Sequence, residues 1–191
     1  MWYLKFKMNL SHLAVIVCLI IAILAPVGAD ANPPALSNKR LKALDDDARV
    51  RLKSALGDMR RRGIRPRVNS TFRTQAEQRS LYRCSSSRRC RARRGIYGAK
   101  PPGTSMHEAG LAVDIGGVAK GRSNRRLTPK GRKIVRIMRK NGFKWRYGLK
   151  DPAHFELSPQ QAGYRTQKAA IKAGQQRWVN SRARRRPGRR A

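Results

Sequence analysis

The stretch S-M-H-E-A-G-L-A-V-D, residues 105–114, sets the organisation of this 191-residue chain. It joins a histidine to acids in a protein that has few of either, with three histidines and ten acids against 45 lysines and arginines. His12 lies in the apolar N-terminus, which leaves His107 and His154 as the only histidines of the remaining chain. Imidazole and carboxylate side chains together are the ligands of a zinc ion that keeps one coordination position open.

The spacing of this stretch requires a turn. His107 and Asp114 are seven residues apart, which would span roughly 23 Å in an extended chain. They can share an ion only if the chain doubles back between them, and Gly110 is suited to such a turn. From Leu111 to Ile115 the residues alternate in period two, which predicts a half-buried strand whose Asp114 faces away from the core.

A second stretch, D-P-A-H-F-E at residues 151–156, holds the other acids and the other histidine of the C-terminal half. Period two puts His154 and Glu156 on one face of a strand and Phe155 on the opposite face. Asp-Pro at its start predicts a tight turn, because proline fixes φ there. The turn would allow Asp151 and His154 to serve one site.

The pattern S-x-H-x-x-G-x-A-x-D followed by D-x-x-H-F-E resembles the zinc peptidases of bacterial cell walls. That family includes D-alanyl-D-alanine carboxypeptidases, D-Ala-D-Ala dipeptidases and L-alanyl-D-glutamate endopeptidases. The segment S-T-F-R-T-Q-A-E-Q at residues 70–78 is similar to the family's upstream segment, so the resemblance covers about residues 65–157. Aspartate at position 151 is closer to the endopeptidase branch, since carboxypeptidase relatives more often carry glutamate there. The zincin motif is absent, because Leu111 stands where its second histidine would be.

The resemblance implies one Zn²⁺ ion held by His107, Asp114 and His154, with water in the fourth position. It implies that Asp151 is the general base for that water. It also implies that Arg73 stabilises the developing oxyanion or binds a substrate carboxylate. Without the resemblance, either histidine alone would be interpreted as a hydrogen-bonded structural side chain, and Arg73 as a solvated surface arginine.

Two further residues belong to the expected site. Glu156 is expected to brace a metal ligand from behind. Ser105 is expected either to contact substrate or to cap the following backbone. The aromatic residues at 143, 145 and 147 are interpreted as core packing rather than as part of the site.

Residues 1–31 are typical of an export signal, because Lys5 and Lys7 precede an apolar run at 13–27 and A-D-A at 29–31 offers a cleavage point. An uncleaved membrane anchor is the alternative, although the run is short for a full span. Cleavage removes two lysines and one aspartate, which changes the net charge from +35 to +34 on 160 residues. We therefore expect one exported domain, in the periplasm, the cell envelope or the extracellular space.

The two cysteines beyond this signal, Cys84 and Cys90, are predicted to form a disulfide in an exported chain. A metal site made of paired thiols and free thiols in a reducing compartment are the alternatives.

The fold class expected is α+β, with a small antiparallel sheet that carries the zinc site and helices packed on one side. The expected segments are a signal peptide at 1–31, a linker at 32–44, a zinc peptidase domain at 45–163 and a basic C-terminal tail at 164–191. Helices are predicted at about 45–62, 74–82, 128–141 and, more weakly, 166–178. Thr74 and Glu77 are predicted to form a capping box at the start of the second of these helices. Strands are predicted at about 65–72, 111–115, 143–147 and 154–157, and a basic loop at 84–103.

The predicted activity is hydrolysis of peptide bonds in peptidoglycan stem peptides, and peptidoglycan peptides are the expected partners. A net charge of +35 and a pI near 11.8 also predict adhesion to anionic polymers of the envelope, with the C-terminal tail as a tether. Two alternatives remain: a cationic nucleic-acid binder and a zinc-containing binding module without hydrolysis. The export signal argues against nucleic acid as the physiological partner, and a monomer is expected.

Overall fold

The computed structural model describes residues 38–94, 98–119 and 126–183. Seven helices, three strands and two short 3-10 turns lie in these ranges: α2 (Asn38–Lys42), α3 (Asp46–Arg61), β1 (Arg67–Ser70), α4 (Gln75–Ser85), α5 (Arg88–Arg94), α6 (Met106–Ala109), β2 (Ala112–Gly116), α7 (Pro129–Lys140), η1 (Gly148–Lys150), β3 (His154–Glu156), η2 (Gln160–Ala162) and α8 (Gln167–Ala183). None of the helices in these ranges is long and apolar enough to cross a membrane.

The three strands form one antiparallel sheet in the order β1-β2-β3, which confirms the predicted fold class. In the β2–β3 pair, Val113 lies opposite Phe155 and Asp114 lies opposite His154. Val113 and Phe155 are fully buried in the core. Since side chains alternate along a strand, burial of this apolar pair directs Asp114 and His154 to the other face of the sheet.

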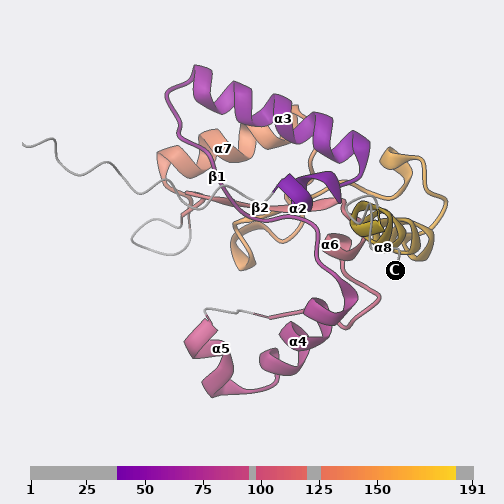
Figure 1. Cartoon of the computed structure of the whole chain (residues 1–191). Coiled ribbons are helices and arrows are strands. Elements are labelled where there is room, and N and C mark those ends of the chain that lie inside the picture. The colour runs from indigo at the N-terminus through magenta and orange to yellow at the C-terminus, as the bar shows by residue number, and fades with distance from the viewer. Residues whose placement is uncertain (1–37, 95–97, 120–125, 184–191) are drawn as a thin grey trace, which may run out of the picture. The chain divides into compact units, whose positions relative to one another are not determined.

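Helices α3 and α7 cover one face of the sheet (Figure 1). Each begins as the sequence predicts: the Asp45 carboxylate accepts from the Asp47 amide at the start of α3, and the Thr128 hydroxyl accepts from the Gly131 amide at the start of α7. Each also buries an apolar stripe against the sheet, with Leu52, Ala55 and Met59 on α3 and Ile134, Ile137 and Met138 on α7.

Helices α4 and α5 lie together on the side of the sheet away from α3 and α7 (Figure 1), and the Cys84–Cys90 disulfide joins them, with 5.3 Å between the two Cα atoms. The disulfide confirms the predicted pairing. Thr74 and Glu77 form the predicted capping box at the start of α4. Helix α5 lies inside residues 84–103, where the sequence predicts a loop. Its arginine-rich sequence has no apolar stripe that would have predicted a helix.

The prediction of a strand at residues 143–147 is wrong. The backbone there makes only an isolated bridge between Lys144 and Glu156, with hydrogen bonds in both directions at 2.7 and 3.0 Å. Phe143 is buried in the core, and the indole of Trp145 donates to the carbonyl of Pro152 at 3.0 Å. The alternation of aromatic residues therefore reflects packing, and the chain turns into η1 before a strand can form.

The packed domain extends beyond residues 45–163 at both ends. Helix α2 and the buried Leu44 lie in the segment expected to be a linker. Helix α8 lies in the segment expected to be a tail, and its Ala170 and Ile171 belong to the core. The predicted export signal at 1–31 and the last eight residues of the predicted tail lie outside the described residues.

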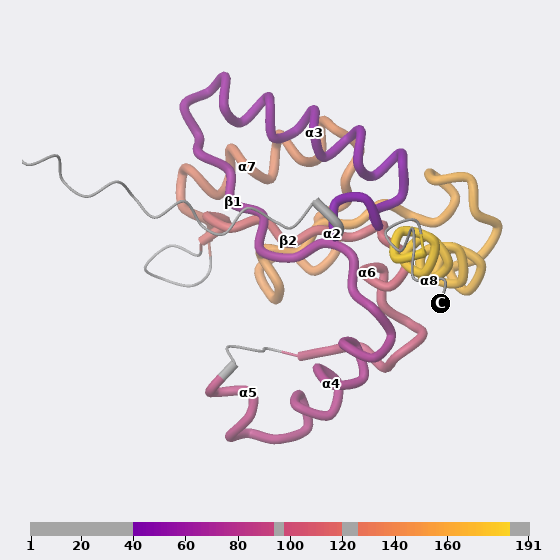
Figure 2. Tube along the Cα trace, in the orientation of Figure 1, coloured from indigo at the N-terminus to yellow at the C-terminus, as the bar shows by residue number. Residues whose placement is uncertain are grey.

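Helix α8 lies beside the short helix α6, at the end of the sheet away from α5 (Figure 2). Gly174 is the point of closest approach. A Cβ atom placed there would lie 2.5 Å from the Glu108 carbonyl oxygen and 2.7 Å from the Ala109 carbonyl carbon. Only glycine allows the two backbones to come this close.

We expect Gly174→Ala to lower the free energy of unfolding by about 1–3 kcal/mol, because α8 must move away from α6 to make room. Gly57→Ala, inside α3, is the matched control. A Cβ there meets only the flexible end of Arg61 at 3.4 Å, so the change should stabilise by roughly 0.5–1 kcal/mol. Urea unfolding of both variants measures the two effects. A Gly174→Ala protein as stable as the unmodified one would contradict the packing.

Candidate metal centre

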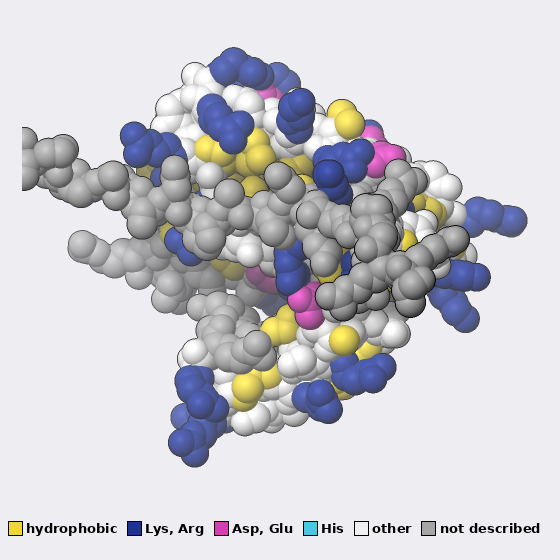
Figure 3. Space-filling model, viewed as in Figure 1, with side chains coloured by type: hydrophobic (Ala, Val, Ile, Leu, Met, Phe, Trp, Pro, Cys, Tyr) yellow, Lys and Arg dark blue, Asp and Glu magenta, His cyan; other side chains and the backbone are white. Residues whose placement is uncertain are grey.

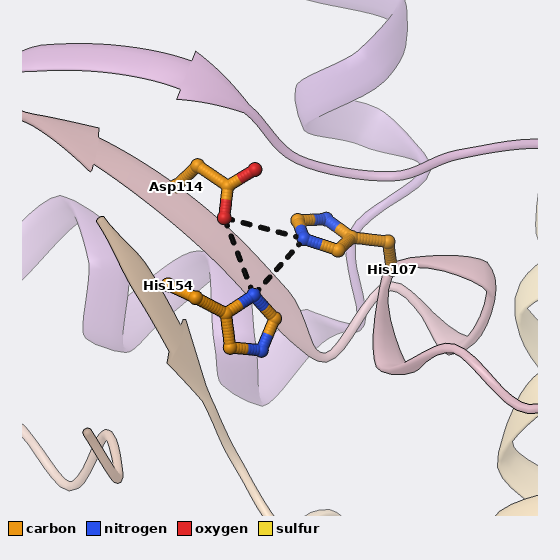
Figure 4. A group of neighbouring side chains, drawn as sticks. All are labelled: His107, Asp114 and His154. Carbon is orange, nitrogen blue, oxygen red and sulfur yellow. Dashed lines mark hydrogen bonds and ion pairs between the residues drawn. The ribbon is translucent and has the colours of Figure 1, made fainter. Parts of the chain in front are cut away.

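Three side chains from different parts of the chain converge on the face of the sheet opposite to α3 and α7 (Figure 4). Asp114 and His154 come from β2 and β3, where they form a directly opposed cross-strand pair. His107 comes from α6, just before the sheet. Gly110 ends α6 with a φ of 71°, which provides the predicted turn between His107 and Asp114.

One atom of each side chain faces the other two. His107 Nε2 lies 3.3 Å from His154 Nδ1 and 3.4 Å from Asp114 Oδ1. His154 Nδ1 lies 3.2 Å from Asp114 Oδ1. The three atoms thus form a nearly equilateral triangle. The sequence predicted this group of three residues as the metal ligands.

The remaining ring nitrogens are fixed by hydrogen bonds that point away from the triangle. His107 Nδ1 lies 2.6 Å from the Thr71 carbonyl oxygen, which can only accept, so Nδ1 donates and Nε2 is the nitrogen that can bind a metal in the neutral ring. His154 Nε2 donates to Glu156 Oε2 at 2.9 Å. These contacts turn both rings toward a common point, as in metal sites whose histidines are held by carbonyl or carboxylate groups. The predicted bracing contact of Glu156 is therefore present.

Charge in the metal-free site is concentrated on these groups. Burial disfavours a charged ring, but hydrogen bonds to Asp114 and Glu156 outweigh burial and raise the pKa of His154 to about 9. Burial likewise opposes ionisation of Asp114, yet the charges and hydrogen bonds of His107 and His154 hold its pKa well below the usual range. The hydrogen bond from His154 also outweighs the burial of Glu156 and lowers its pKa. At neutral pH, both carboxylates are therefore ionised.

The geometry fits one zinc ion. A tetrahedral zinc bonded at about 2.0–2.1 Å separates neighbouring ligand atoms by about 3.3 Å, which is the spacing of the triangle. Two imidazole nitrogens and one carboxylate oxygen are a donor set that zinc accepts, and three protein ligands leave a fourth position for water or substrate.

Asp151 lies at the edge of the site, where the predicted turn forms: its carbonyl accepts from the His154 amide at 3.3 Å. The residue is accessible to solvent. Partial desolvation of its carboxyl group and the negative charge of Asp114 raise its pKa, although His154, His107 and Arg73 act in the opposite direction. A raised pKa makes the carboxylate a better proton acceptor, which suits the predicted role of general base.

Arg73 lies at the predicted corner between β1 and α4. Its guanidinium donates to the Gln78 side chain at 2.8 Å and to the Ser70 hydroxyl at 3.3 Å. Burial lowers the pKa of Arg73, while the negative charge of Asp114 raises it. The side chain is therefore anchored within electrostatic reach of the metal centre, and it borders a pocket of about 280 Å³ whose other lining residues are Arg40, Ser70, Glu77, Ser80 and Leu81.

Ser105 is buried at the N-cap position of α6. Its amide and that of Gly103 donate to the fully buried Glu108 carboxylate, at 3.0 to 3.1 Å. Glu108 therefore holds the loop that leads into α6. This arrangement favours the capping role for Ser105, and its contact with substrate stays a prediction.

Three neighbours of the site were not identified from the sequence. The Thr71 carbonyl orients His107, but a backbone group carries no sequence signal. Gln78 holds Arg73 and also donates to the Lys100 carbonyl at 2.7 Å. It is nearly inaccessible, which only the structure shows, and the sequence signal was an uncharged polar residue in a basic helix. The centroids of the Tyr147 and His154 rings lie 5.1 Å apart, so this residue, which the sequence assigned to core packing, packs against a candidate metal ligand.

The fold and site define a small α+β protein with a candidate zinc centre on an antiparallel sheet. The family model of the VanY D-alanyl-D-alanine carboxypeptidases matches residues 41–168, which is most of the chain. The chain therefore belongs to this family, which confirms the resemblance in its motifs. No relative was found among curated proteins.

Two solved structures are similar to the chain. One is the LD-carboxypeptidase LdcB, with 22% identity and a TM-score of 0.43 over 72% of this chain and 64% of that one. The chain thus spans less than two thirds of LdcB. The other is a variant of the D,D-pentapeptidase VanY from a VanB-type vancomycin-resistance cassette, in complex with Zn(II). It has 23% identity and a TM-score of 0.44 over 72% of this chain and 84% of that one.

Zinc affinity should rise with pH below about pH 9. In the metal-free protein the pKa of His154 is about 9, so the ring is protonated at neutral pH, whereas a bound ion requires its neutral form. Each displaced proton changes the apparent dissociation constant by about tenfold per pH unit. Competition with a chromophoric chelator between about pH 6 and about pH 8 measures this slope.

Glu156→Gln is the matched control for the pH experiment. It keeps a hydrogen-bond acceptor for His154 but removes the negative charge that favours the protonated ring, so the pH slope should become shallower. Affinity should also fall by about 10–100-fold, because the ligand loses its carboxylate partner. A pH-independent affinity in the unmodified protein would contradict the assignment of His154 as a ligand.

Proposed function

We propose that the chain is an exported zinc peptidase that hydrolyses peptide bonds in peptidoglycan stem peptides. The observation that carries the proposal is the triangle of His107 Nε2, Asp114 Oδ1 and His154 Nδ1, whose sides of 3.2 to 3.4 Å match the ligand spacing of tetrahedral zinc. Membership of the carboxypeptidase family supports the substrate class. It favours release of C-terminal D-alanine, whereas Asp151 in place of glutamate favours the endopeptidase branch.

Bound zinc would supply a water molecule whose pKa is lowered toward neutrality and a positive charge beside the scissile carbonyl. Asp151 accepts the proton of the attacking water and returns it to the leaving amine. The turn that joins Asp151 to His154 leaves its carboxyl group within electrostatic reach of Asp114 and both histidines, and its exposure leaves room for substrate. Asp114 would be the carboxylate ligand of the ion, and the ionised Glu156 holds the His154 ring.

Arg73 supplies the positive charge on the other flank of the reacting group. Gln78 and Ser70 restrict the guanidinium, so little side-chain freedom is lost when it binds an oxyanion or a substrate carboxylate. The pocket that it shares with Ser80 and Leu81 of α4 offers a place for a neighbouring part of the stem peptide.

Location and secondary partners follow from charge and from the disulfide. The Cys84–Cys90 bond supports an oxidising compartment, in agreement with the export signal expected at residues 1–31.

No acid occurs between Glu77 and Glu108, and the exposed arginines of α4 and α5 make no ion pair with other described residues. Figure 3 shows lysine and arginine side chains gathered over α3 and over α4 and α5. Such a surface would hold the enzyme on anionic envelope polymers rather than on nucleic acid.

The proposal is tested by incubating the zinc-loaded protein with purified peptidoglycan and with defined stem peptides, followed by mass spectrometry of the products. Release of D-alanine that a chelator abolishes would establish a carboxypeptidase. Cleavage between L-alanine and D-glutamate would establish an endopeptidase. Intact substrates in the presence of stoichiometric bound zinc would overturn the proposal in favour of a binding module.

Asp151→Asn should retain zinc affinity within about twofold but lower turnover by about 10²–10⁴-fold, because the amide cannot accept the proton. Asp46→Asn is the matched control, since Asp46 is exposed on α3 and pairs only with Arg49. Chelator competition and steady-state kinetics on the cleaved peptide provide the two measurements. Near-normal turnover in the Asn variant would remove Asp151 from this role.

A further inference from the structure

Helix α8 begins where the family match ends. The match covers residues 41–168, whereas α8 runs from Gln167 to Ala183. Its contacts nevertheless reach the two backbone segments that carry His107 and Arg73 of the candidate site. Gly174 rests on the backbone of α6, which carries His107, and Trp178 stacks on Phe72, next to Arg73, with 5.4 Å between ring centroids.

Gln175 makes the most informative contacts of α8. Its side-chain amide donates to the carbonyl of Arg73 at 3.2 Å and to the carbonyl of Glu108 at 2.9 Å. Its side-chain oxygen accepts from the backbone amide of Gln75 at 3.1 Å. Both donor hydrogens and the acceptor oxygen of the amide are therefore in use. Gln75 is the first residue of α4, so this oxygen also satisfies one of the unpaired amides at the helix start.

These contacts join two backbone segments that carry functional side chains. The Arg73 amide donates to the His107 carbonyl at 3.0 Å. This bond places the arginine corner, by which we mean Arg73 and its neighbours between β1 and α4, against α6. Gln175 ties the carbonyl of Arg73 to the next residue of α6 after His107. Arg177 adds a bond to the Ala109 carbonyl at 2.6 Å and a salt bridge to Asp45 at 3.3 Å. The arginine corner, α6 and α8 are thus connected through backbone groups.

We propose that α8 sets the position of Arg73 relative to the metal ligands and that Gln175 is the positioning residue. The inference rests on the proposed function, because it assigns to Arg73 a part in the reaction. A water molecule could satisfy each of the three backbone groups separately, but only a side chain that binds all three fixes their relative positions. Displacement of a reacting group by about 1 Å can cost about a hundredfold in rate, so a fixed corner matters for turnover.

The test is a double-mutant cycle of Gln175→Ala with Arg73→Lys, measured as kcat/KM on the peptide that the enzyme cleaves. Gln175→Ala alone should lower kcat/KM by about tenfold or more, since the guanidinium is displaced. In the Arg73→Lys background the same change should cost less than about twofold, because the group being positioned is already impaired. Zinc affinity should stay within about twofold in every variant, because the ligand contacts are untouched.

Gln176→Ala is the matched control. Gln176 is the next residue of α8, is exposed, and its side chain bonds only Asn180 among the residues that the structure describes, so its removal should leave kcat/KM unchanged. An equal loss for Gln175→Ala in both backgrounds, or a loss that follows zinc release, would overturn the inference. Those results would show a general structural effect rather than positioning of Arg73.

A second measurement does not depend on catalysis. Amide hydrogen exchange at Arg73 and Gln75 should become faster in Gln175→Ala but not in Gln176→Ala. The Ile115 amide, which bonds the Ala153 carbonyl at 2.9 Å in the sheet, serves as the internal reference. Unchanged exchange at Arg73, or equal acceleration at Ile115, would contradict the proposal. A protein without peptidase activity would defeat the proposed function, and the exchange experiment would still decide whether Gln175 fixes the corner.

Discussion

The cross-strand pairing of β2 with β3 is the constraint on which the site depends. Val113 and Phe155 face each other on the buried side of this pair, so the register that buries them also sets Asp114 opposite His154 on the other side. A slip by one residue would turn the carboxylate into the core and the apolar side chains toward solvent. The hydrophobic energy of the core therefore holds two candidate metal ligands 3.2 Å apart in strands of only five and three residues.

The third ligand cannot be held in this way, because His107 lies outside the sheet. Backbone contacts position His107 instead. The Thr71 carbonyl orients its ring, the Arg73 amide donates to the His107 carbonyl, and Gly174 allows α8 to pack on the end of α6. The same contacts bring Arg73 to the site. One set of backbone interactions thus positions both the metal ligand from α6 and the cationic group that would act with it.

Acidic side chains gather at the candidate metal centre, whereas basic side chains lie on the surface, and each placement has a physical reason. Apart from Glu108, which caps its own loop, every acid beyond residue 80 lies in or beside the candidate metal centre. Burying Asp114 and Glu156 would be costly in isolation, and their hydrogen bonds with the His154 ring compensate part of that cost. The many lysines and arginines stay on the surface, as Figure 3 shows for one face, where they remain solvated and available to anionic polymers.

The sequence by itself predicted the three candidate ligands, through its resemblance to the family. It also determined the turn at Gly110, the Asp151–His154 turn, the capping box of α4 and the disulfide, since each of these depends on residues close together in the chain. It also determined the family, through motifs of fixed spacing. The predictions from sequence failed where packing between distant segments decides the secondary structure. The aromatic alternation at residues 143–147 suited a strand, but η1 follows there; α5 has no apolar stripe; and the buried positions of α8 are mostly small residues that fit against α6. Only the tertiary structure could show that Gln175, 102 residues after Arg73, bonds its carbonyl, because that contact depends on how backbones approach each other and not on any local pattern.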